Sequence, residues 1–168
     1  EGNFGIKDFI KPYTDISDEK TADFLLKEWY SSHNEPLLVM KGMGGIGKTT
    51  VIKYFLDELY KTLNRQNKLN ILFINSHEII DDIMKNSKID NLFDFYRIIA
   101  DKNDIQDRFD KKLLELSIDS GNMIIVLDGL DEVIAKMGTK FNISNFINSI
   151  FEDYTENLEK TKIIITCR

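Results

Sequence analysis

The sequence predicts an α/β domain in which a mainly parallel sheet lies between layers of helices. Short apolar runs, each about the length of one strand, alternate along the chain with segments whose apolar residues recur at helical spacing. The strand runs are apolar throughout, which is typical of strands that are buried on both faces of a parallel sheet. The chain has 168 residues, the size of one domain. We therefore expect a single α/β domain over residues 1–168.

The individual elements are predicted from the same two periodicities. Four runs have the composition of buried strands, and these are 37–40, 71–75, 123–127 and 163–166. Amphipathic helices are expected over about 18–31, 48–64 and 143–157, where apolar residues recur on one face. The stretch 76–119 is helical in pattern, but its charged and Asn-rich composition leaves the boundaries of its helices undefined. Residues 1–17 are irregular and contain Pro12.

Bulk composition excludes several classes of function. The net charge of −6 and pI of about 5.0 argue against a non-specific grip on nucleic acid, which requires a basic surface. A single cysteine, Cys167, excludes an internal disulfide and fits a reducing compartment. No signal peptide and no apolar run of bilayer length is present, so we expect a cytoplasmic domain without membrane contact. The chain begins at Glu1 and stops directly after a strand run, and we expect a fragment of a longer protein.

A glycine-rich loop follows the first strand run and fits the pattern G-x-x-x-x-G-K-[ST]. Its residues are Gly42, Met43, Gly44, Gly45, Ile46, Gly47, Lys48, Thr49 and Thr50. The glycines allow backbone N–H groups to approach anionic oxygens, and the loop ends at a helix N-terminus, where negative charge is favoured. We expect Lys48 to reach the β- and γ-phosphates of a nucleotide and the Thr49 hydroxyl to bind Mg²⁺. The loop therefore predicts a P-loop nucleotide site for ATP with Mg²⁺.

An acidic segment follows the third strand run. Asp128 comes directly after four apolar residues, so its carboxylate is expected at the carboxyl end of a parallel strand, where open α/β sheets bind ligands. There it is placed to hold Mg²⁺, usually through water. Asp131 and Glu132 are candidates to orient or deprotonate the attacking water. The alternative for the segment is a solvated turn, and for the last two acids a place at a helix start.

Together these residues resemble one family. The string G-M-G-G-I-G-K-T-T with L-D-G-L-D-E resembles the NACHT branch of the STAND signalling NTPases, whose signature is a small residue after the Mg²⁺ aspartate, here Gly129, and an acid two further on, here Asp131. AAA+ enzymes of the adenylate type would instead place a glutamate at position 129. The run 163–168 is similar to the family's sensor strand, so Arg168 is expected either to sense the γ-phosphate or to pair with an acid. Residues 1–17 are expected to form the adenine-side segment, because residues 9–13, with Pro12, look like the family's string that packs against adenine.

The resemblance implies a three-layer P-loop NTPase of the ASCE type with strand order 5-1-4-3-2. It places the sensor strand between the phosphate-loop strand and the Asp128 strand, and it places the fifth strand, a helical lid and a winged-helix domain beyond Arg168. It also implies a switch that binds ATP, self-associates in that state through regions outside this chain, and is reset when the bound ATP is slowly hydrolysed to ADP. Such proteins act in immune or antiphage defence.

Two other functions stay open at this stage. A nucleotide-locked interaction module without significant turnover is compatible with every motif. A GTPase would need an N-K-x-D string after the Asp128 strand, and the nearest string, at 87–90, precedes that strand. Among residues outside the motifs, we expect His77 to lie at the surface and Cys167 to be a small buried residue.

Overall fold

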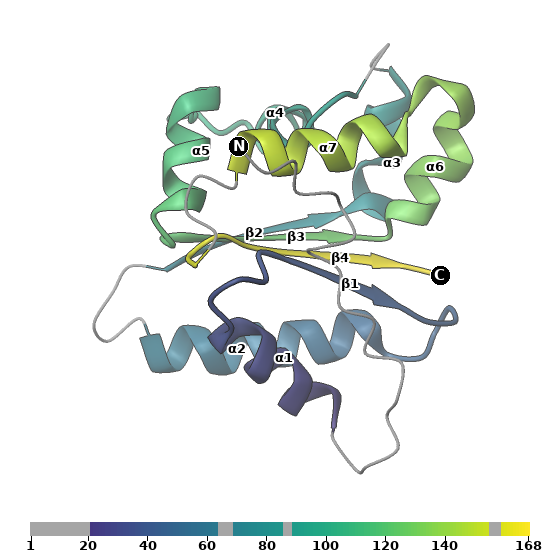
Figure 1. The fold of residues 1–168 in the computed structure, drawn as a ribbon. Helices are drawn as coiled ribbons and strands as arrows, with labels where there is room; N and C mark the ends of the chain where they lie inside the picture. The colour runs from purple at the N-terminus through teal and green to yellow at the C-terminus, as the bar shows by residue number, and fades with distance from the viewer. Residues whose placement is uncertain (1–20, 64–68, 86–88, 155–158) are drawn as a thin grey trace, which may run out of the picture.

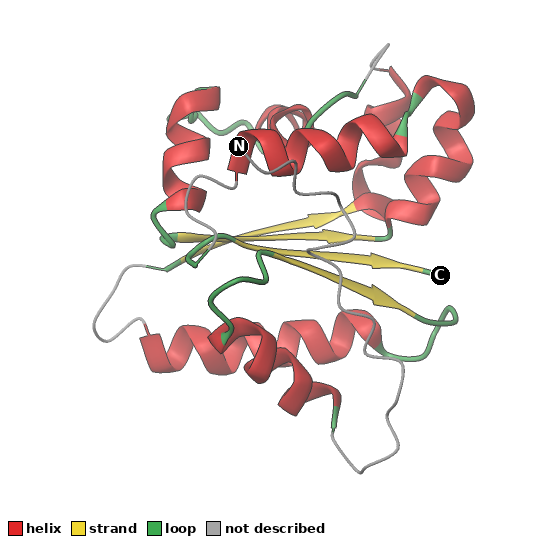
Figure 2. Ribbon diagram, viewed as in Figure 1, coloured by secondary structure: helices red, strands yellow, loops and turns green. Residues whose placement is uncertain are grey.

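The computed structural model of the chain describes residues 21–63, 69–85, 89–154 and 159–168. The expected adenine-side segment 1–17, with Pro12, lies outside these ranges. The described residues form three layers, with a central sheet and helices on both of its faces (Figures 1 and 2). The predicted three-layer α/β class is therefore confirmed.

The central sheet contains four parallel strands in the order β1-β4-β3-β2. The strands are β1 (Leu37–Lys41), β2 (Asn70–Asn75), β3 (Met123–Asp128) and β4 (Lys162–Cys167). This order agrees with the expected 5-1-4-3-2, and the described residues contain no fifth strand. Because β4 lies between β1 and β3, its carboxyl end is adjacent to both the glycine loop and the acidic segment.

Two helices cover one face of the sheet, below it in Figure 1. They are α1 (Ala22–Ser31) and α2 (Lys48–Leu63), and their buried side chains, such as Trp29 and Phe55, pack with Ile164 of β4. The expected start of α1 near residue 18 is wrong. Thr21 is extended, with φ −69° and ψ 154°, and its side chain accepts a hydrogen bond from the Phe24 N–H, so it caps the helix there.

Within the described ranges, the helices from α3 to α7 cover the opposite face (Figure 1). They are α3 (Ser76–Lys85), α4 (Leu92–Lys102), α5 (Lys111–Asp119), α6 (Leu130–Met137) and α7 (Ile143–Tyr154), with a short 3₁₀ turn, η2 (Gly138–Lys140), before α7. The 76–119 stretch is divided by caps: Asn91 and Asp94 form a capping box, and Asp110 caps α5. No helix in the described ranges is both long and apolar enough to span a membrane.

Strand β1 departs from the prediction of burial on both faces. Leu37 is buried, but Val39 is 40% exposed, whereas every residue of β3 is buried. The reason is position in the sheet: in the described part of the chain β1 is an outer strand that pairs with β4 alone. An apolar run indicates that its side chains prefer to be buried. It does not indicate whether a neighbouring strand or helix is present to bury them.

A buried lysine joins α1 to the centre of the sheet. Lys162, at the start of β4, is 3% exposed, and its Nζ donates hydrogen bonds to the carbonyls of Trp29 (3.2 Å), Ser32 (2.7 Å) and Glu35 (3.2 Å). The same ammonium lies 5.1 Å from the centre of the Trp29 ring. Burial disfavours the charged form and lowers the pKa of Lys162 to about 8.

Candidate functional site

A pocket of about 310 Å³ opens at the carboxyl edge of the sheet. Parallel strands all end at this edge, where the glycine loop and the acidic segment meet (Figure 1). Its lining combines glycines with polar and charged side chains: Gly44, Gly45, Lys48, Thr49, Asn75, His77, Asp128, Gly129, Asp131, Glu132, Thr166 and Arg168. The pocket therefore joins residues from the phosphate loop, from the acidic segment and from the last strand.

The phosphate loop connects β1 to the start of α2. Gly45 and Gly47 have φ values of +77° and +94°, a left-handed backbone that residues with a Cβ rarely adopt. Because α2 begins at Lys48, its first N–H groups lie at the pocket, where the helix favours negative charge. The Gly42 N–H donates to the Cys167 carbonyl at 3.2 Å, which ties the loop to β4.

The side chain of Lys48 turns back over its own loop. Its Nζ donates to the carbonyls of Gly42 (2.6 Å) and Met43 (3.0 Å). Other predicted loop residues do not line the pocket with their side chains: Met43 and Ile46 are 77% and 65% exposed, and Thr50 is also exposed. A contribution of these residues to phosphate binding would come from the backbone.

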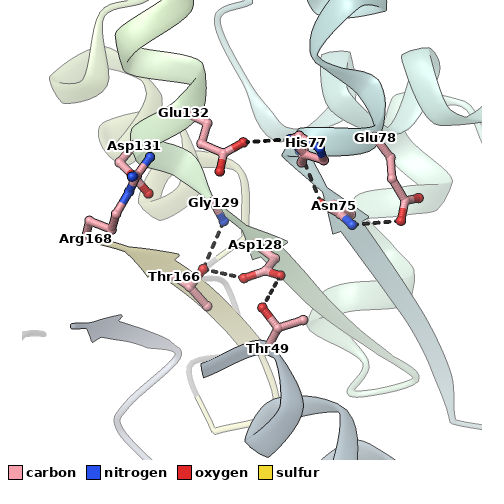
Figure 3. A network of polar contacts seen from close by, with 10 residues as sticks. All are labelled: Thr49, Asn75, His77, Glu78, Asp128, Gly129, Asp131, Glu132, Thr166 and Arg168. Carbon is pink, nitrogen blue, oxygen red and sulfur yellow. Dashed lines mark hydrogen bonds and ion pairs between the residues drawn. The ribbon is translucent and has the colours of Figure 1, made fainter. Parts of the chain in front are cut away.

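Asp128 is the centre of a hydrogen-bond network that joins three elements (Figure 3). Its Oδ2 accepts from the Thr49 hydroxyl of α2 at 2.7 Å, and its Oδ1 accepts from the Thr166 hydroxyl of β4 at 2.5 Å. The Thr166 oxygen in turn accepts from the Gly129 N–H at 2.9 Å. With Asp128 only 9% exposed, this carboxylate is held by two hydroxyls from different parts of the chain.

The acids after Asp128 lie in the first turn of a helix. Gly129 is left-handed, with φ +84°, and α6 begins at the next residue, so Asp131 and Glu132 occupy the helix start that was the alternative stated for them. Asp131 Oδ2 accepts from Arg168 Nε at 2.7 Å, and Glu132 Oε2 lies 3.5 Å from His77 Nδ1 (Figure 3). Asp131 raises the pKa of the exposed Arg168 guanidinium through this bond. Arg168 therefore pairs with an acid here.

Four pocket residues were not among the predicted site residues: Asn75, His77, Gly129 and Thr166. Asn75 is paired in register with Asp128, and its side-chain oxygen accepts from the His77 N–H at 3.2 Å. His77 is at the surface, as expected, but beside Glu132. Thr166 lies inside the network of Asp128. Each follows or ends a strand, and a polar residue at the carboxyl end of a strand is the sequence signal that would have found Asn75 and Thr166.

Cys167 differs from its predicted burial. It is half-buried rather than buried, because it is the last residue of β4 and lies at the open edge of the sheet. Partial burial raises the pKa of its thiol.

The donor set fits Mg²⁺ bound together with phosphate. Mg²⁺ is usually held by one or two carboxylates plus substrate phosphates and water, rather than by an all-protein cage. Asp128 and Thr49 supply one carboxylate and one hydroxyl, and the described ranges contain no group of three or more His, Cys, Asp or Glu residues suited to a metal. A divalent ion at this position would therefore depend on the ligand's phosphates.

The left-handed turn at Gly129 gives a first prediction. Gly129→Ala is expected to lower the free energy of unfolding by about 1–2 kcal/mol, because a Cβ at φ +84° is strained. Chemical denaturation measures this loss. Gly138→Ala, at the other end of α6 with φ +54°, is the matched control: a similar stability loss is expected there, without an effect on ligand binding at the pocket. Unchanged stability in Gly129→Ala would contradict the strain.

The crystal structure of Cdc6p from Pyrobaculum aerophilum is similar at 16% identity and a TM-score of 0.47, over 87% of this chain and 36% of that chain. Among curated proteins nothing matches. The family model of the ATPases associated with various cellular activities (AAA) matches residues 38–168, from β1 to the end of the chain. Since this match covers most of its length, the chain belongs to the AAA family of ATPases.

Proposed function

We propose that this ATPase-family domain is the Mg²⁺-dependent, ATP-binding and slowly hydrolysing switch of a STAND/NACHT signalling protein. One observation carries the nucleotide site: Lys48, Thr49 and Asp128 converge on one pocket, from the loop and from the carboxyl end of β3. A phosphate chain lying along the loop would meet backbone N–H groups, the Lys48 ammonium and a metal held by the other two residues. Gly42 to Thr50 thus binds phosphates, and Asp128 with Thr49 binds the ion.

The two acids of α6 support slow hydrolysis. Asp131 and Glu132 both line the pocket, where they would orient or deprotonate the attacking water. Each also has a basic neighbour, since Asp131 is bonded to Arg168 and Glu132 lies near His77. Asp131 is engaged by Arg168, so this ion pair has to open before Asp131 can orient water, and this is consistent with low turnover. Arg168 would be released from Asp131 when it contacts the terminal phosphate.

The signalling assignment rests on the sequence of the acidic segment and of the last strand. Gly129 follows Asp128 and Asp131 stands two residues further on, which is the NACHT pattern. Arg168 directly follows β4, the strand that lies between the other two motifs. On this proposal, exchange of ATP for ADP controls self-association through parts of the protein outside this chain. The cellular role proposed is immune or antiphage defence in the cytoplasm.

The test measures ATP binding and phosphate release in the full-length protein. Glu132→Gln is expected to lower the rate of phosphate release by roughly 100-fold, the loss typical of a general base, while ATP affinity changes little. Glu152→Gln, an exposed acid on α7, is the control and should leave the rate unchanged. The assembly state is measured by light scattering with ATP and with ADP.

The outcomes separate the alternatives. ATP binding without detectable phosphate release in the unmutated protein would replace the enzyme by a nucleotide-locked interaction module. A preference for GTP in competition would replace it by a GTPase. An assembly state that does not differ between ATP and ADP would contradict the switch, while leaving the nucleotide site in place.

A further inference from the structure

The hydroxyl of Thr166 contacts both parts of the acidic segment. Thr166 is 1% exposed at the carboxyl end of β4, the inner strand that lies between β1 and β3. Its Oγ1 donates to Asp128 Oδ1 at 2.5 Å and accepts from the Gly129 N–H at 2.9 Å (Figure 3). A threonine hydroxyl carries one hydrogen, and that hydrogen is directed to Asp128. It is therefore not available to donate to a phosphate.

We propose that Thr166 is a positioning residue that sets the metal-binding orientation of Asp128 and the turn that begins α6. This inference rests on the proposed function, because it concerns the same Mg²⁺–ATP site. It assigns Thr166 a role through protein groups, which differs from direct contact of this strand end with the γ-phosphate.

The orientation of the Asp128 carboxylate depends on both of its partners. Rotation about the bond to the carboxyl group is soft, so the directions of the two oxygens are fixed by the hydrogen bonds that they accept. Thr49, the partner of Oδ2, belongs to the ligand site and faces the pocket. Thr166, the partner of Oδ1, also borders the pocket, but it is 1% exposed on the inner strand β4 and its hydrogen is already directed to Asp128. The hydrogen bond from Thr166 thus fixes the orientation of the Asp128 carboxylate.

The second bond of Thr166 acts on the helix that carries Asp131 and Glu132. Gly129 is the N-cap of α6, with φ +84° and no side chain of its own to cap the helix. Its N–H is satisfied by the Thr166 oxygen, which holds the left-handed turn in place. The Thr166 hydroxyl therefore links two parts of the site: the Asp128 carboxylate that would bind the metal, and the start of the helix that carries the two acids that would act on water.

Thr166→Val removes the hydroxyl while keeping the shape of the side chain. We expect the Mg²⁺ concentration at half-saturation of ATP binding to rise by roughly 10-fold, the loss typical of residues that orient a metal ligand. ATP affinity in EDTA should stay within about two-fold of the unmutated protein, because the phosphate loop is untouched. Thr166→Ser retains the donor and should restore the Mg²⁺ dependence. All variants are made in the full-length protein.

The chain offers a matched control at the other end of the same strand. Thr161, directly before β4, is 0% exposed, and its Oγ1 donates to Asp119 Oδ1 at 3.0 Å. Thr161→Val therefore breaks the same kind of buried threonine–aspartate bond away from the pocket. A purely structural effect of losing such a bond would be shared by both valine variants, whereas a positioning role changes the Mg²⁺ dependence of Thr166→Val alone.

Each result decides the inference. It is overturned if Thr166→Val has the Mg²⁺ dependence of the unmutated protein, or if its ATP affinity falls equally in Mg²⁺ and in EDTA. If Thr166→Val does not fold, Thr166→Cys, whose thiol is a weak donor, is measured against the same two limits. Unmutated protein that binds ATP without any Mg²⁺ dependence overturns the proposed metal site and the inference together. If the unmutated protein binds ATP with a clear Mg²⁺ dependence and Thr166→Val has the same Mg²⁺ dependence, the inference alone is overturned.

Discussion

Replacing Lys48 by alanine is expected to lower the affinity for ATP by roughly 100-fold, which corresponds to about 2.7 kcal/mol. Hydrogen bonds made by a charged donor contribute about 1.5–3 kcal/mol each, and a terminal phosphate would receive at least one from this ammonium. Lys48 Nζ already lies over the loop, bonded to the carbonyls of Gly42 and Met43, so only a short movement is needed to reach a phosphate. Titration with a fluorescent ATP analogue measures the loss.

A second lysine on the same helix serves as the control. Lys61 lies in the last turn of α2 and forms an exposed ion pair with Asp57 at 2.5 Å. Lys61→Ala removes one positive charge from α2 without touching the pocket, and exposed pairs of this kind contribute little to stability. Its ATP affinity should remain within about two-fold of the unmutated protein. Equal affinity of Lys48→Ala and Lys61→Ala would refute the nucleotide site.

Replacing Lys162 by methionine is expected to destabilise the domain by about 2 kcal/mol at pH 7. The change removes the hydrogen bonds that the ammonium donates to the carbonyls of Trp29, Ser32 and Glu35, and losing hydrogen bonds from a charged donor costs about 1.5–3 kcal/mol. It also removes the cation from the face of the Trp29 ring. Relief of the buried charge offsets part of this cost. Urea denaturation monitored by the single tryptophan measures the difference.

The same lysine gives the stability a defined dependence on pH. Burial lowers its pKa from 10.5 to about 8, so between these values the unfolded chain holds a proton that the folded chain has released. The free energy of unfolding therefore rises with pH across this window, by up to about 3 kcal/mol relative to Lys162→Met. The exposed Lys140, changed to methionine, should show no such difference. A constant difference between pH 7 and 10 would contradict the lowered pKa.

The layers and the phosphate loop were predictable because they depend on short-range patterns. The apolar runs mark the strands, and Gly42 to Thr49 has a spacing set by the backbone geometry that phosphates require. The confirmed strand order came from the resemblance of the motifs, since periodicity alone does not determine which strands pair. Helix starts were less predictable. Thr21, Asn91 and Asp110 begin helices because their side chains accept hydrogen bonds from backbone N–H groups, and in sequence such residues look the same as ordinary polar surface residues.

The contacts within the pocket required the tertiary structure. Asp128 and Thr166 are 38 residues apart, and nothing local to either residue records that their oxygens lie at 2.5 Å. The exposure of Val39 likewise depends on the neighbours that β1 has in the sheet, not on its own sequence. Residue types and their positions at strand ends thus identify candidate site residues. Only the folded structure identifies which of them form hydrogen bonds with one another.

The hydroxyls of Thr49 and Thr166 hold Asp128 before any ligand is present, and this has a consequence for binding thermodynamics. The rotational freedom of the carboxylate is lost when the chain folds, so the arrival of Mg²⁺ and nucleotide incurs little further ordering entropy at this position. A carboxylate that is ordered in advance favours the binding of ATP and of ADP alike. An interaction that is equal in two states does not shift the equilibrium between them. On the proposed function, we expect discrimination between ATP and ADP to come from the exposed rim, where the ion pair of Arg168 with Asp131 costs little to open.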